Sequence, residues 1–359
     1  MTRPARVVID LAALEHNFLR VRELASQSRV MAVVKADAYG HGISRIARKL
    51  GGADAFGVAC LEEARELRMA GIQQRIVLLE GPYAINELDE ITRLNLDIVV
   101  HHQSQVEMLE ACSLPEPVTV WMKIDSGMHR LGFQEHEFKA MLQRLLDCDT
   151  VAENIIMMTH LALASDRNND MTGRQIEIFT RICSGTDAEK SIANSAAVLA
   201  FPDSHADWVR PGLMLYGVSP LSDSLSSNDD LLPVMTLESR LIAVKMLKAN
   251  EPVGYGATYR CPEDMRVGVV AAGYGDGYPR HAPSGTPVLV NGKRVTLIGR
   301  ASMDMLTVDL RSQPEADVGD PVILWGHGLP VEEVANHAGT IAYELLCGVH
   351  KRLQFTEHG

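Results

Sequence analysis

Between residues 30 and 217 the chain alternates short apolar runs with amphipathic stretches, and this alternation constrains the fold more than any other feature. Several runs are rich in β-branched residues and apolar at consecutive positions, which is typical of strands buried on both faces of a parallel sheet. The eight runs are Val30–Val34, Ala55–Ala59, Ile76–Leu79, Ile98–Val100, Val118–Met122, Ile155–Met158, Ser191–Ala193 and Leu213–Tyr216. We therefore expect eight parallel strands joined by helices.

The segments between these runs have the periodicity of amphipathic helices. Leu61–Ala70 groups its apolar residues on one face and is followed by Gly71, a helix stop signal. Gln134–Leu146 shows the same pattern, with charged residues on the opposite face. An open, doubly wound sheet is the alternative, but no GxGxxG follows the first strand. The sequence therefore predicts an α/β fold built on a (β/α)₈ TIM-type barrel.

The pattern changes after residue 222. Ser222–Asp230 is polar and rich in turn-forming residues, so we expect a linker there. Short β-like runs follow at Leu241–Leu247, Val267–Ala272, Val288–Val290, Val295–Ile298, Leu306–Leu310 and Val322–Trp325. Asn291-Gly292 predicts a type I′ hairpin turn, and Val7–Ile9 is a candidate added strand. We predict a barrel over residues 10–225 and a C-terminal, mostly β domain formed by residues 1–9 and 226–359.

The composition excludes several classes of protein. Lys and Arg number 34 against 46 Asp and Glu, a formal net charge of −12, which argues against a nucleic-acid-binding surface. No apolar run approaches the ~18 residues of a membrane span, and the N-terminus has no signal-peptide pattern. Six cysteines without CxxC spacing are typical of reduced thiols rather than metal ligands. We expect a cytoplasmic protein with no metal site.

Lys35 directly follows the first apolar run, at the carboxyl end of a strand, where the active sites of such barrels are built. Partial desolvation there favours the neutral amine that imine chemistry requires. A rim lysine that reaches solvent is the commoner role when the strand is considered alone. The flanking Tyr39-Gly40-His41-Gly42 favours a ligand site, because glycines allow a ligand to approach the backbone closely.

A second group of candidate residues lies around the seventh and eighth runs. Asn194-Ser195 follows the seventh run, and Arg210-Pro211-Gly212 precedes the eighth. Loops at these places commonly bind phosphate in such barrels, although a helix cap at Ser195 or a simple turn at Pro211-Gly212 is individually commoner. A strand-end lysine combined with a phosphate site predicts an aldehyde cofactor that carries a phosphate, namely pyridoxal 5'-phosphate.

Six segments of the chain closely resemble the alanine racemases, which are barrel-type pyridoxal-phosphate enzymes, and the resemblance runs essentially end to end. The segments are AVVKADAYGHG around Lys35, VWMKIDSGMHRLGF at 120–133, WVRPGLMLYG at 208–217, VGYGATY at 253–259, GYGDGYPR at 273–280 and GRASMDM at 299–305. The resemblance implies an isomerase that interconverts L-alanine and D-alanine, either for cell-wall synthesis or for alanine catabolism.

The resemblance also implies two catalytic bases on opposite faces of the cofactor. Lys35 would carry the cofactor and, once the substrate displaces it, act as one base, while Tyr255 would be the other. One base removes the α-proton from one enantiomer, and the other returns a proton from the opposite side. Tyr255 would bond His160, which bonds Arg210, which faces the pyridine nitrogen of the cofactor. From the strand pattern alone, His160 is equally a core histidine.

Other positions carry over from the matched segments. The implied phosphate-binding residues are Tyr39, Asn194, Ser195, Gly212, Leu213 and Tyr343. Arg130 would bind the cofactor's phenolic oxygen and the substrate carboxylate, and Met303 would donate a backbone N–H to that carboxylate, although methionine is more often a core residue. Tyr274 would narrow the entrance for a small side chain. Lys123 matches a lysine that can be carbamylated.

In the alanine racemases, active sites are shared across a head-to-tail homodimer. The resemblance therefore implies that Tyr255, Tyr274 and Met303 of one copy would complete the active site of the other. The chain departs from the family after His160: an acid is common five residues on, but Ser165 stands there and Asp166 follows. The entrance to the site is therefore expected to differ. A broader racemase for serine or larger side chains is the nearest alternative function. A decarboxylase of the same architecture is a second, and Tyr255 argues against it. A single-barrel carrier of the cofactor is a third, but such carriers have no β domain.

Overall fold

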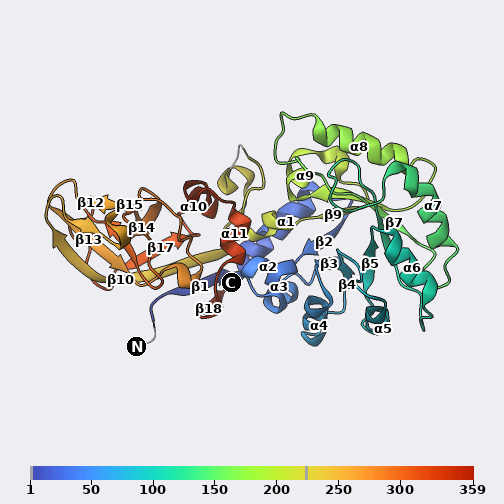
Figure 1. The fold of residues 1–359 in the computed structure, drawn as a ribbon, viewed down its shortest axis with the longest axis horizontal. Helices are drawn as coiled ribbons and strands as arrows, with labels where there is room; N and C mark the ends of the chain where they lie inside the picture. Colours follow the sequence, from blue (N-terminus) through green and yellow to red (C-terminus); the bar gives the residue numbers. More distant parts are fainter. Residues whose placement is uncertain (1–2, 223–224) are drawn as a thin grey trace. The chain divides into compact units, whose positions relative to one another are not determined.

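The computed structural model describes residues 3–222 and 225–359, and the chain divides into two compact units (Figure 1). The barrel unit comprises residues 15–215 and 219–222, and the β unit comprises residues 3–14, 216–218 and 225–359. The sequence prediction drew its boundaries at residues 9/10 and 225/226. The structure instead groups residues 10–14 and 216–218 with the β unit.

The barrel unit contains a closed sheet of eight parallel strands, which confirms the predicted (β/α)₈ barrel. The strands are β2 (Arg29–Val33), β3 (Ala55–Val58), β4 (Arg75–Leu78), β5 (Asp97–Val100), β6 (Val120–Lys123), β7 (Ile156–Met158), β8 (Lys190–Asn194) and β9 (Trp208–Arg210). The first and last strands pair in parallel and close the barrel, with Val30 opposite Val209. All the carboxyl ends of the strands therefore meet at one face.

The predicted eighth strand was wrong. Leu213–Tyr216 forms a 3₁₀ helix (η3), and the strand that closes the barrel is instead Trp208–Arg210. Pro211 follows this strand directly and has no N–H to donate to a ladder, so it ends the strand. The apolar character of Leu213–Tyr216 reflects burial rather than an extended backbone, because all four residues are buried.

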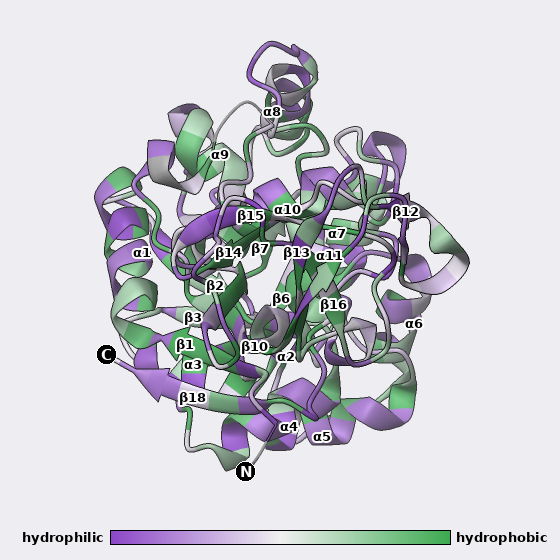
Figure 2. Cartoon of the chain, turned by 90° about the vertical axis from the view of Figure 1, so that its left-hand side faces the viewer, coloured by the Kyte–Doolittle hydropathy of each residue, from purple (hydrophilic) through white to green (hydrophobic). Residues whose placement is uncertain are grey.

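Helices surround the barrel and place their apolar faces against the strands. They are α1 (Leu11–Leu24), α2 (Lys35–Gly40), α3 (Ile43–Lys49), α4 (Leu61–Met69), α5 (Leu88–Arg93), α6 (Gln103–Ala111), α7 (Glu135–Leu146), α8 (Met171–Ile182) and α9 (Ser195–Ala200). In α4 the predicted apolar face of Leu61, Ala64 and Leu67 is buried. Figure 2 shows the mixed hydrophobic and hydrophilic residues of such helices. Inside the barrel, Trp121 and Trp208 pack edge to face with their ring centroids 5.2 Å apart.

The β unit is organised around an eight-stranded sheet in the order β13-β16-β15-β14-β17-β10-β1-β18, with a further β13–β10 pairing. These strands are β1 (Arg6–Asp10), β10 (Met235–Leu247), β13 (Met265–Val270), β14 (Pro287–Val290), β15 (Lys293–Leu297), β16 (Leu306–Asp309), β17 (Pro321–Trp325) and β18 (Gln354–His358). All their pairings are antiparallel except β1 with β18. The expected N-terminal strand is confirmed as β1.

The predicted hairpin turn is also confirmed. Asn291 and Gly292 connect β14 to β15 and have φ angles of 52° and 72°, as a type I′ turn requires. The same unit contains the small ladder β11 (Pro252–Val253) with β12 (Tyr259–Arg260) and the helices α10 (Val331–Ala338) and α11 (Ala342–Cys347), none of which the sequence reasoning identified.

Part of the expected linker, residues 223–224, lies outside the described residues, and Ser226–Asp229 forms a short 3₁₀ helix (η4). Within the described ranges, no helix is long and apolar enough to cross a bilayer. All six cysteine thiols are free of disulfide bonds.

Candidate active site

Lys35 lies just beyond the carboxyl end of β2, where it is half-buried. The next four residues, Ala36 to Tyr39, have φ angles of 54–55° and ψ angles of 40–51°, so they form a turn of left-handed helix. This conformation costs an L-residue roughly 1–2 kcal/mol. Strained backbone of this kind persists only where the surroundings hold it, and it is concentrated at functional sites.

Side chains within this segment stabilise the turn. Asp37 Oδ1 accepts the N–H of Ile43 at 2.8 Å. His41 Nδ1 lies 3.0 Å from the carbonyl oxygen of Ala38 and 2.9 Å from that of Tyr39. Burial lowers the pKa of His41 to about 4, so the imidazole is neutral and donates from Nδ1. The sequence reasoning saw the glycines here but not the left-handed turn.

Three of the expected phosphate-binding positions meet at Gly212. The hydroxyl of Ser195 accepts the backbone N–H of Gly212 at 2.8 Å and that of Met214 at 3.4 Å. A Cβ atom added at Gly212 would lie only 2.5 Å from the hydroxyl oxygen of Tyr39. A side chain at position 212 would therefore require the Tyr39 ring to shift.

Two further positions border the same corner. Asn194 ends β8, and its side chain caps α9 by accepting the N–H of Ala197 at 3.1 Å. Its Nδ2 also donates to the carbonyl oxygen of Leu161 at 3.3 Å. Leu213 is buried at the start of η3. The structure thus gathers hydroxyl and backbone groups around one point at the carboxyl ends of β8 and β9.

Arg210 is buried at the end of β9, and its hydrogen-bond acceptors among the described residues are neutral. Its guanidinium donates to the Ser191 hydroxyl at 2.6 Å and to the carbonyl oxygens of Thr159 at 2.5 Å and Ile192 at 3.3 Å. Burial lowers its pKa to about 10, so it stays charged at neutral pH. Ser191 and Thr159 were missed by the sequence reasoning, because only the closed barrel brings β7, β8 and β9 side by side.

His160 is the remaining neighbour of Arg210, with Nδ1 3.4 Å from the guanidinium. Burial and then the charges of Arg210 and Lys123 hold the pKa of His160 well below its usual value. The ring is therefore neutral, accepts from Arg210 at Nδ1 and carries its hydrogen on Nε2. This order of donors is the one expected of a relay that ends at a tyrosine oxygen.

Lys123 is buried at the carboxyl end of β6 among other cations. Burial first, and then the positive charges of Arg210, Arg130 and Lys35, lower the pKa of Lys123 to about 8. The carboxylate of Glu80 acts in the opposite direction. The mouth of the barrel is thus strongly positive, although the chain as a whole is acidic, and it suits a ligand with more than one anionic group.

The loop after β6 presents Arg130 at its exposed end. Asp125 organises this loop by accepting the N–H groups of Gly127 and His129, both at 3.0 Å. Its other oxygen lies 2.9 Å from His129 Nδ1. Burial alone would raise the pKa of Asp125, but these hydrogen bonds outweigh it, so the carboxyl group is ionised and the loop is fixed.

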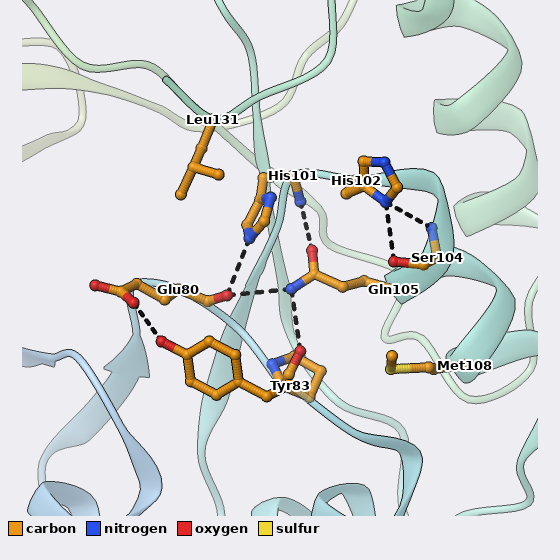
Figure 3. A pocket seen from close by; sticks show the side chains of 9 residues that line it. Glu80, Tyr83, His101, His102, Ser104, Gln105, Met108 and Leu131 are labelled. Carbon is orange, nitrogen blue, oxygen red and sulfur yellow. Dashed lines mark hydrogen bonds between the residues drawn. The ribbon is translucent and has the colours of Figure 1, made fainter. Parts of the chain in front are cut away.

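A pocket of about 350 Å³ lies beside this loop (Figure 3). It is lined by Glu80, Pro82, Tyr83, His101, His102, Ser104, Gln105, Met108 and Leu131. Gln105 organises it by accepting the N–H of His101 at 2.9 Å and donating to the Glu80 carbonyl at 3.1 Å. None of the candidate site residues lines this pocket, although Leu131 adjoins Arg130 in the chain.

The remaining candidates lie in the β unit, and their side chains are open to solvent. Tyr255 in the short 3₁₀ helix η5 (Tyr255–Ala257) is 69% exposed, and Met303 is 53% exposed. Tyr274, in η6 (Tyr274–Asp276), and Tyr343, in α11, are exposed to a smaller degree. Tyr255 and Tyr274 lie on short 3₁₀ turns, and Tyr343 lies in the first turn of a short helix.

The loops that carry Tyr274 and Met303 are joined by backbone hydrogen bonds. The N–H of Tyr274 donates to the carbonyl of Ser302 at 3.0 Å, and that of Gly275 donates to the carbonyl of Met303 at 2.8 Å. The turn of Tyr255 approaches the second of these loops, because a Cβ atom at Gly256 would lie 3.3 Å from the guanidinium of Arg300.

A buried carboxylate, Asp276, anchors these loops. Arg3 and Arg352 both bond it, and it also accepts the N–H of Gly273 at 2.9 Å. Arg352 reaches on to the carboxylate of Asp304 at 2.7 Å. Burial alone would raise the pKa of Asp276, but these bonds lower it. Sequence reasoning missed this cluster because Arg3 and Asp276 are 273 positions apart.

Comparison with known proteins relates both units of the chain to the alanine racemases. The family model "Alanine racemase, N-terminal domain" matches residues 9–220, and "Alanine racemase, C-terminal domain" matches residues 234–356. An alanine racemase of Shewanella denitrificans is 52% identical, with 97% of each chain covered.

Solved structures agree over the full length. The biosynthetic alanine racemase of Pseudomonas aeruginosa superposes with a TM-score of 0.97 at 46% identity, and both chains are covered completely. The alanine racemase of Bartonella henselae with covalently bound pyridoxal phosphate has a TM-score of 0.90 at 26% identity and covers 99% of this chain and 100% of its own. With the two family models together spanning nearly the whole chain, the protein belongs to the alanine racemase family.

Proposed function

We propose that Lys35 and Tyr255 are the two bases of an alanine racemase reaction, and that the mouth of the barrel binds the cofactor of that reaction. Membership of the family makes the chain an isomerase that interconverts L-alanine and D-alanine with pyridoxal 5'-phosphate. The observation that carries the residue assignments is the buried cluster of cations beside Lys35, in which the acceptors of Arg210 among the described residues are neutral.

The residues at the mouth of the barrel fit pyridoxal phosphate. The two hydroxyls of Tyr39 and Ser195 converge at Gly212, where a Cβ atom would crowd the Tyr39 hydroxyl, and this corner suits a phosphate group. Asn194, Leu213 and Tyr343 would complete the phosphate site. When bound, the cofactor acts as an electron sink that acidifies the α-proton of an attached amino acid.

Arg210 and His160 would set the protonation of the groups around them. A guanidinium that is always charged disfavours protonation of a ring nitrogen that faces it. Because neutral His160 accepts from Arg210 at Nδ1, its Nε2–H is available to donate to the oxygen of Tyr255. Such a bond stabilises the phenolate form, which a tyrosine needs in order to accept a proton.

Arg130 and the backbone N–H of Met303 would hold the substrate carboxylate, and Tyr274 would limit the side chain to the size of alanine's. Lys123 is a candidate for carbamylation, since a pKa of about 8 leaves an appreciable fraction as the neutral amine that reacts with carbon dioxide. The resulting carbamate would be anionic and would give Arg130 a partner of opposite charge.

We further propose a homodimer in which each active site combines Lys35 of one subunit with Tyr255 of the partner subunit. The exposure of Tyr255, Met303 and Tyr274 supports this arrangement, because catalytic and substrate-binding side chains act in a site from which water is largely excluded. The six free thiols support a reducing setting such as the cytoplasm.

Subunit complementation tests this proposal. The variants Lys35→Ala and Tyr255→Ala are each expected to be inactive in racemisation. After subunit exchange in a one-to-one mixture, half of the dimers are mixed, and each mixed dimer contains one complete site. About a quarter of the wild-type activity is then expected for a two-fold dimer.

Mixing Lys35→Ala with the double variant Lys35→Ala/Tyr255→Ala is the matched control and should recover nothing. If the mixture of Lys35→Ala and Tyr255→Ala shows no racemase activity although native mass spectrometry detects mixed dimers, the shared site is contradicted. Rates for alanine, serine and larger amino acids in both directions then define the substrate range. A serine rate equal to the alanine rate would favour the broader racemase.

A further inference from the structure

Glu63 is a half-buried acid in the first turn of α4 that the proposed function does not use. Its carboxylate accepts two backbone N–H groups from different loops of the barrel. Oε1 accepts the N–H of Ala36 at 2.6 Å, and Oε2 accepts the N–H of Ala59 at 2.8 Å. Ala36 directly follows Lys35, and Ala59 directly follows β3.

The carboxylate connects two strands at the point where their own pairing ends. The N–H of Val34 donates to the carbonyl of Gly57 at 2.9 Å, and beyond this bond the chain turns away from β3. Glu63 extends the connection by one more step, with a side chain in place of a backbone carbonyl. The end of β2 is thereby fixed relative to its neighbour in the barrel.

The bond from Ala36 is the one that bears on Lys35. The N–H of Ala36 belongs to the peptide group that joins it to Lys35, so an acceptor at 2.6 Å sets the orientation of that peptide plane. Ala36 is also the first residue of the left-handed turn, with φ at 55°. The first N–H groups of a helical turn have no acceptor within the turn, so an outside acceptor is needed to hold it.

A carboxylate suits this position better than any neutral side chain. Each of its two oxygens accepts one N–H, whereas an amide has a single acceptor oxygen and would turn an NH₂ group toward one of the two donors. Glu66 provides a contrast on the same helix, because it is exposed and accepts from the Ser44 hydroxyl at 3.0 Å rather than from two backbone N–H groups.

We propose that Glu63 is a positioning residue for Lys35. Its carboxylate holds the peptide after Lys35 at the start of the left-handed turn, and this orientation directs the lysine amine toward the cofactor. The inference rests on the proposed role of Lys35 as the residue that carries pyridoxal phosphate.

The test compares purified wild-type holoenzyme with Glu63→Gln, the matched control Glu66→Gln, and Lys35→Ala. Glu63→Gln is expected to lower kcat about tenfold or more in both directions with KM for alanine nearly unchanged, because misplacing a reacting group slows the chemical step rather than substrate binding. A second readout is the rate at which hydroxylamine removes the cofactor, followed by its absorbance. We expect removal to be several times faster in Glu63→Gln and unchanged in Glu66→Gln.

Circular dichroism and active-site titration normalise every rate to folded, cofactor-loaded protein. If Glu63→Gln does not fold, Glu63→Asp takes its place, because it keeps the charge and both acceptors but is shorter by one methylene, and the same two changes are expected at smaller size. Wild-type values of kcat and hydroxylamine rate in the folded Glu63 variant would overturn the inference while Lys35 keeps its role. Retention of racemisation by Lys35→Ala would overturn both.

Discussion

Buried charges are accommodated in opposite ways in the two units. In the barrel unit, Lys123 and Arg210 are buried and interact with other cations or with neutral acceptors. In the β unit, the buried charge is the carboxylate of Asp276, and two arginines compensate it fully. The candidate site residues of the β unit are exposed, whereas most of those in the barrel unit are buried, with Lys35 half-buried and Arg130 exposed.

The difference indicates that the buried charges of the barrel unit serve to bind an anionic ligand, whereas those of the β unit serve to stabilise its loops. Uncompensated buried cations cost folding free energy, and an anionic ligand returns that energy when it binds. A compensated ion cluster stabilises its own loops and needs no ligand. The barrel is therefore organised to attract anions, and the β unit to present side chains on preformed loops.

Replacing Lys35 with alanine tests the barrel side of this comparison most severely. Without the amine, cofactor attachment and one of the two bases are lost together, so racemisation should fall to background in both directions. The measurements are polarimetry with each enantiomer and the visible absorbance of the bound cofactor. If the variant unfolds at the same temperature as the wild type, the loss of racemisation comes from the missing amine and not from misfolding. Residual racemisation in a folded variant would refute the assignment of Lys35.

Removing the hydroxyl of Tyr255 should slow the exchange of the α-proton from one enantiomer of alanine more than from the other. Tyr255→Phe is expected to keep the cofactor but slow α-proton exchange from one enantiomer about a hundredfold or more, since a general base contributes at that scale. Deuterium incorporation from heavy water, started separately from L- and D-alanine, measures it. Tyr259→Phe, four residues on, is the control and should exchange normally; equal small losses in both directions would contradict the two-base scheme.

Asp276→Asn should destabilise the β unit by about 1.5–3 kcal/mol, because it removes charge-assisted hydrogen bonds from two arginines that are themselves about one-third exposed. The pKa of Asp276 is lowered in the folded protein, so its stabilisation is complete above the unfolded pKa of about 4 and is lost as the pH falls further through the folded pKa. Denaturant unfolding at pH 7 and at acidic pH should therefore show a difference that shrinks on acidification.

Asp304→Asn is the matched control for this measurement, because Asp304 bonds Arg352 but is half exposed. Its effect should stay below about 1 kcal/mol, as for other surface ion pairs. If the two variants lose the same free energy of unfolding, burial of the Asp276 carboxylate does not increase its contribution to stability.

Lys123→Met should change stability in the opposite direction, making the folded apo-protein more stable. A pKa lowered to about 8 from 10.5 means that the folded apo-protein disfavours the charged amine, by about 3 kcal/mol at pH 7. This cost is fully present below pH 8 and disappears as the pH rises to about 10.5, so wild-type stability should increase across that window while the variant's does not. Unfolding of apo-protein in carbon-dioxide-free buffer measures the difference, and a variant less stable than wild type at pH 7 would contradict it.

The sequence predicted the barrel because each strand carries a local apolar signal, and seven of the eight strands appear where that signal lies. The eighth prediction failed at Leu213–Tyr216, since burial of a 3₁₀ helix produces the same apolar run as a buried strand. The short helices α10 and α11 were missed among β-like segments for the complementary reason: neither is long enough to show a clear period.

Lys35, Asn194-Ser195 and Arg210-Pro211-Gly212 were candidates from their places at strand ends, the other site residues came from motif resemblance, and the roles of all of them remain predictions. What no local pattern contained was the support around them. Ser191 and Thr159 meet Arg210 only after β7, β8 and β9 assemble, and Glu63 reaches Ala36 across 27 positions. The left-handed turn itself has no sequence signature, because it contains two alanines, an aspartate and a tyrosine rather than glycines.

The position of β1 in the sheet of the β unit has a consequence for synthesis of the chain. Arg6 pairs with Glu238 on one side and with Gln354 on the other, so β1 leaves the ribosome before its partners, which are made more than 200 residues later. At ordinary translation rates that interval is on the order of tens of seconds. The barrel can therefore complete its fold before the loops of Tyr274 and Met303 exist. With the residue roles proposed above, a nascent chain would be able to bind the cofactor before it could select a substrate.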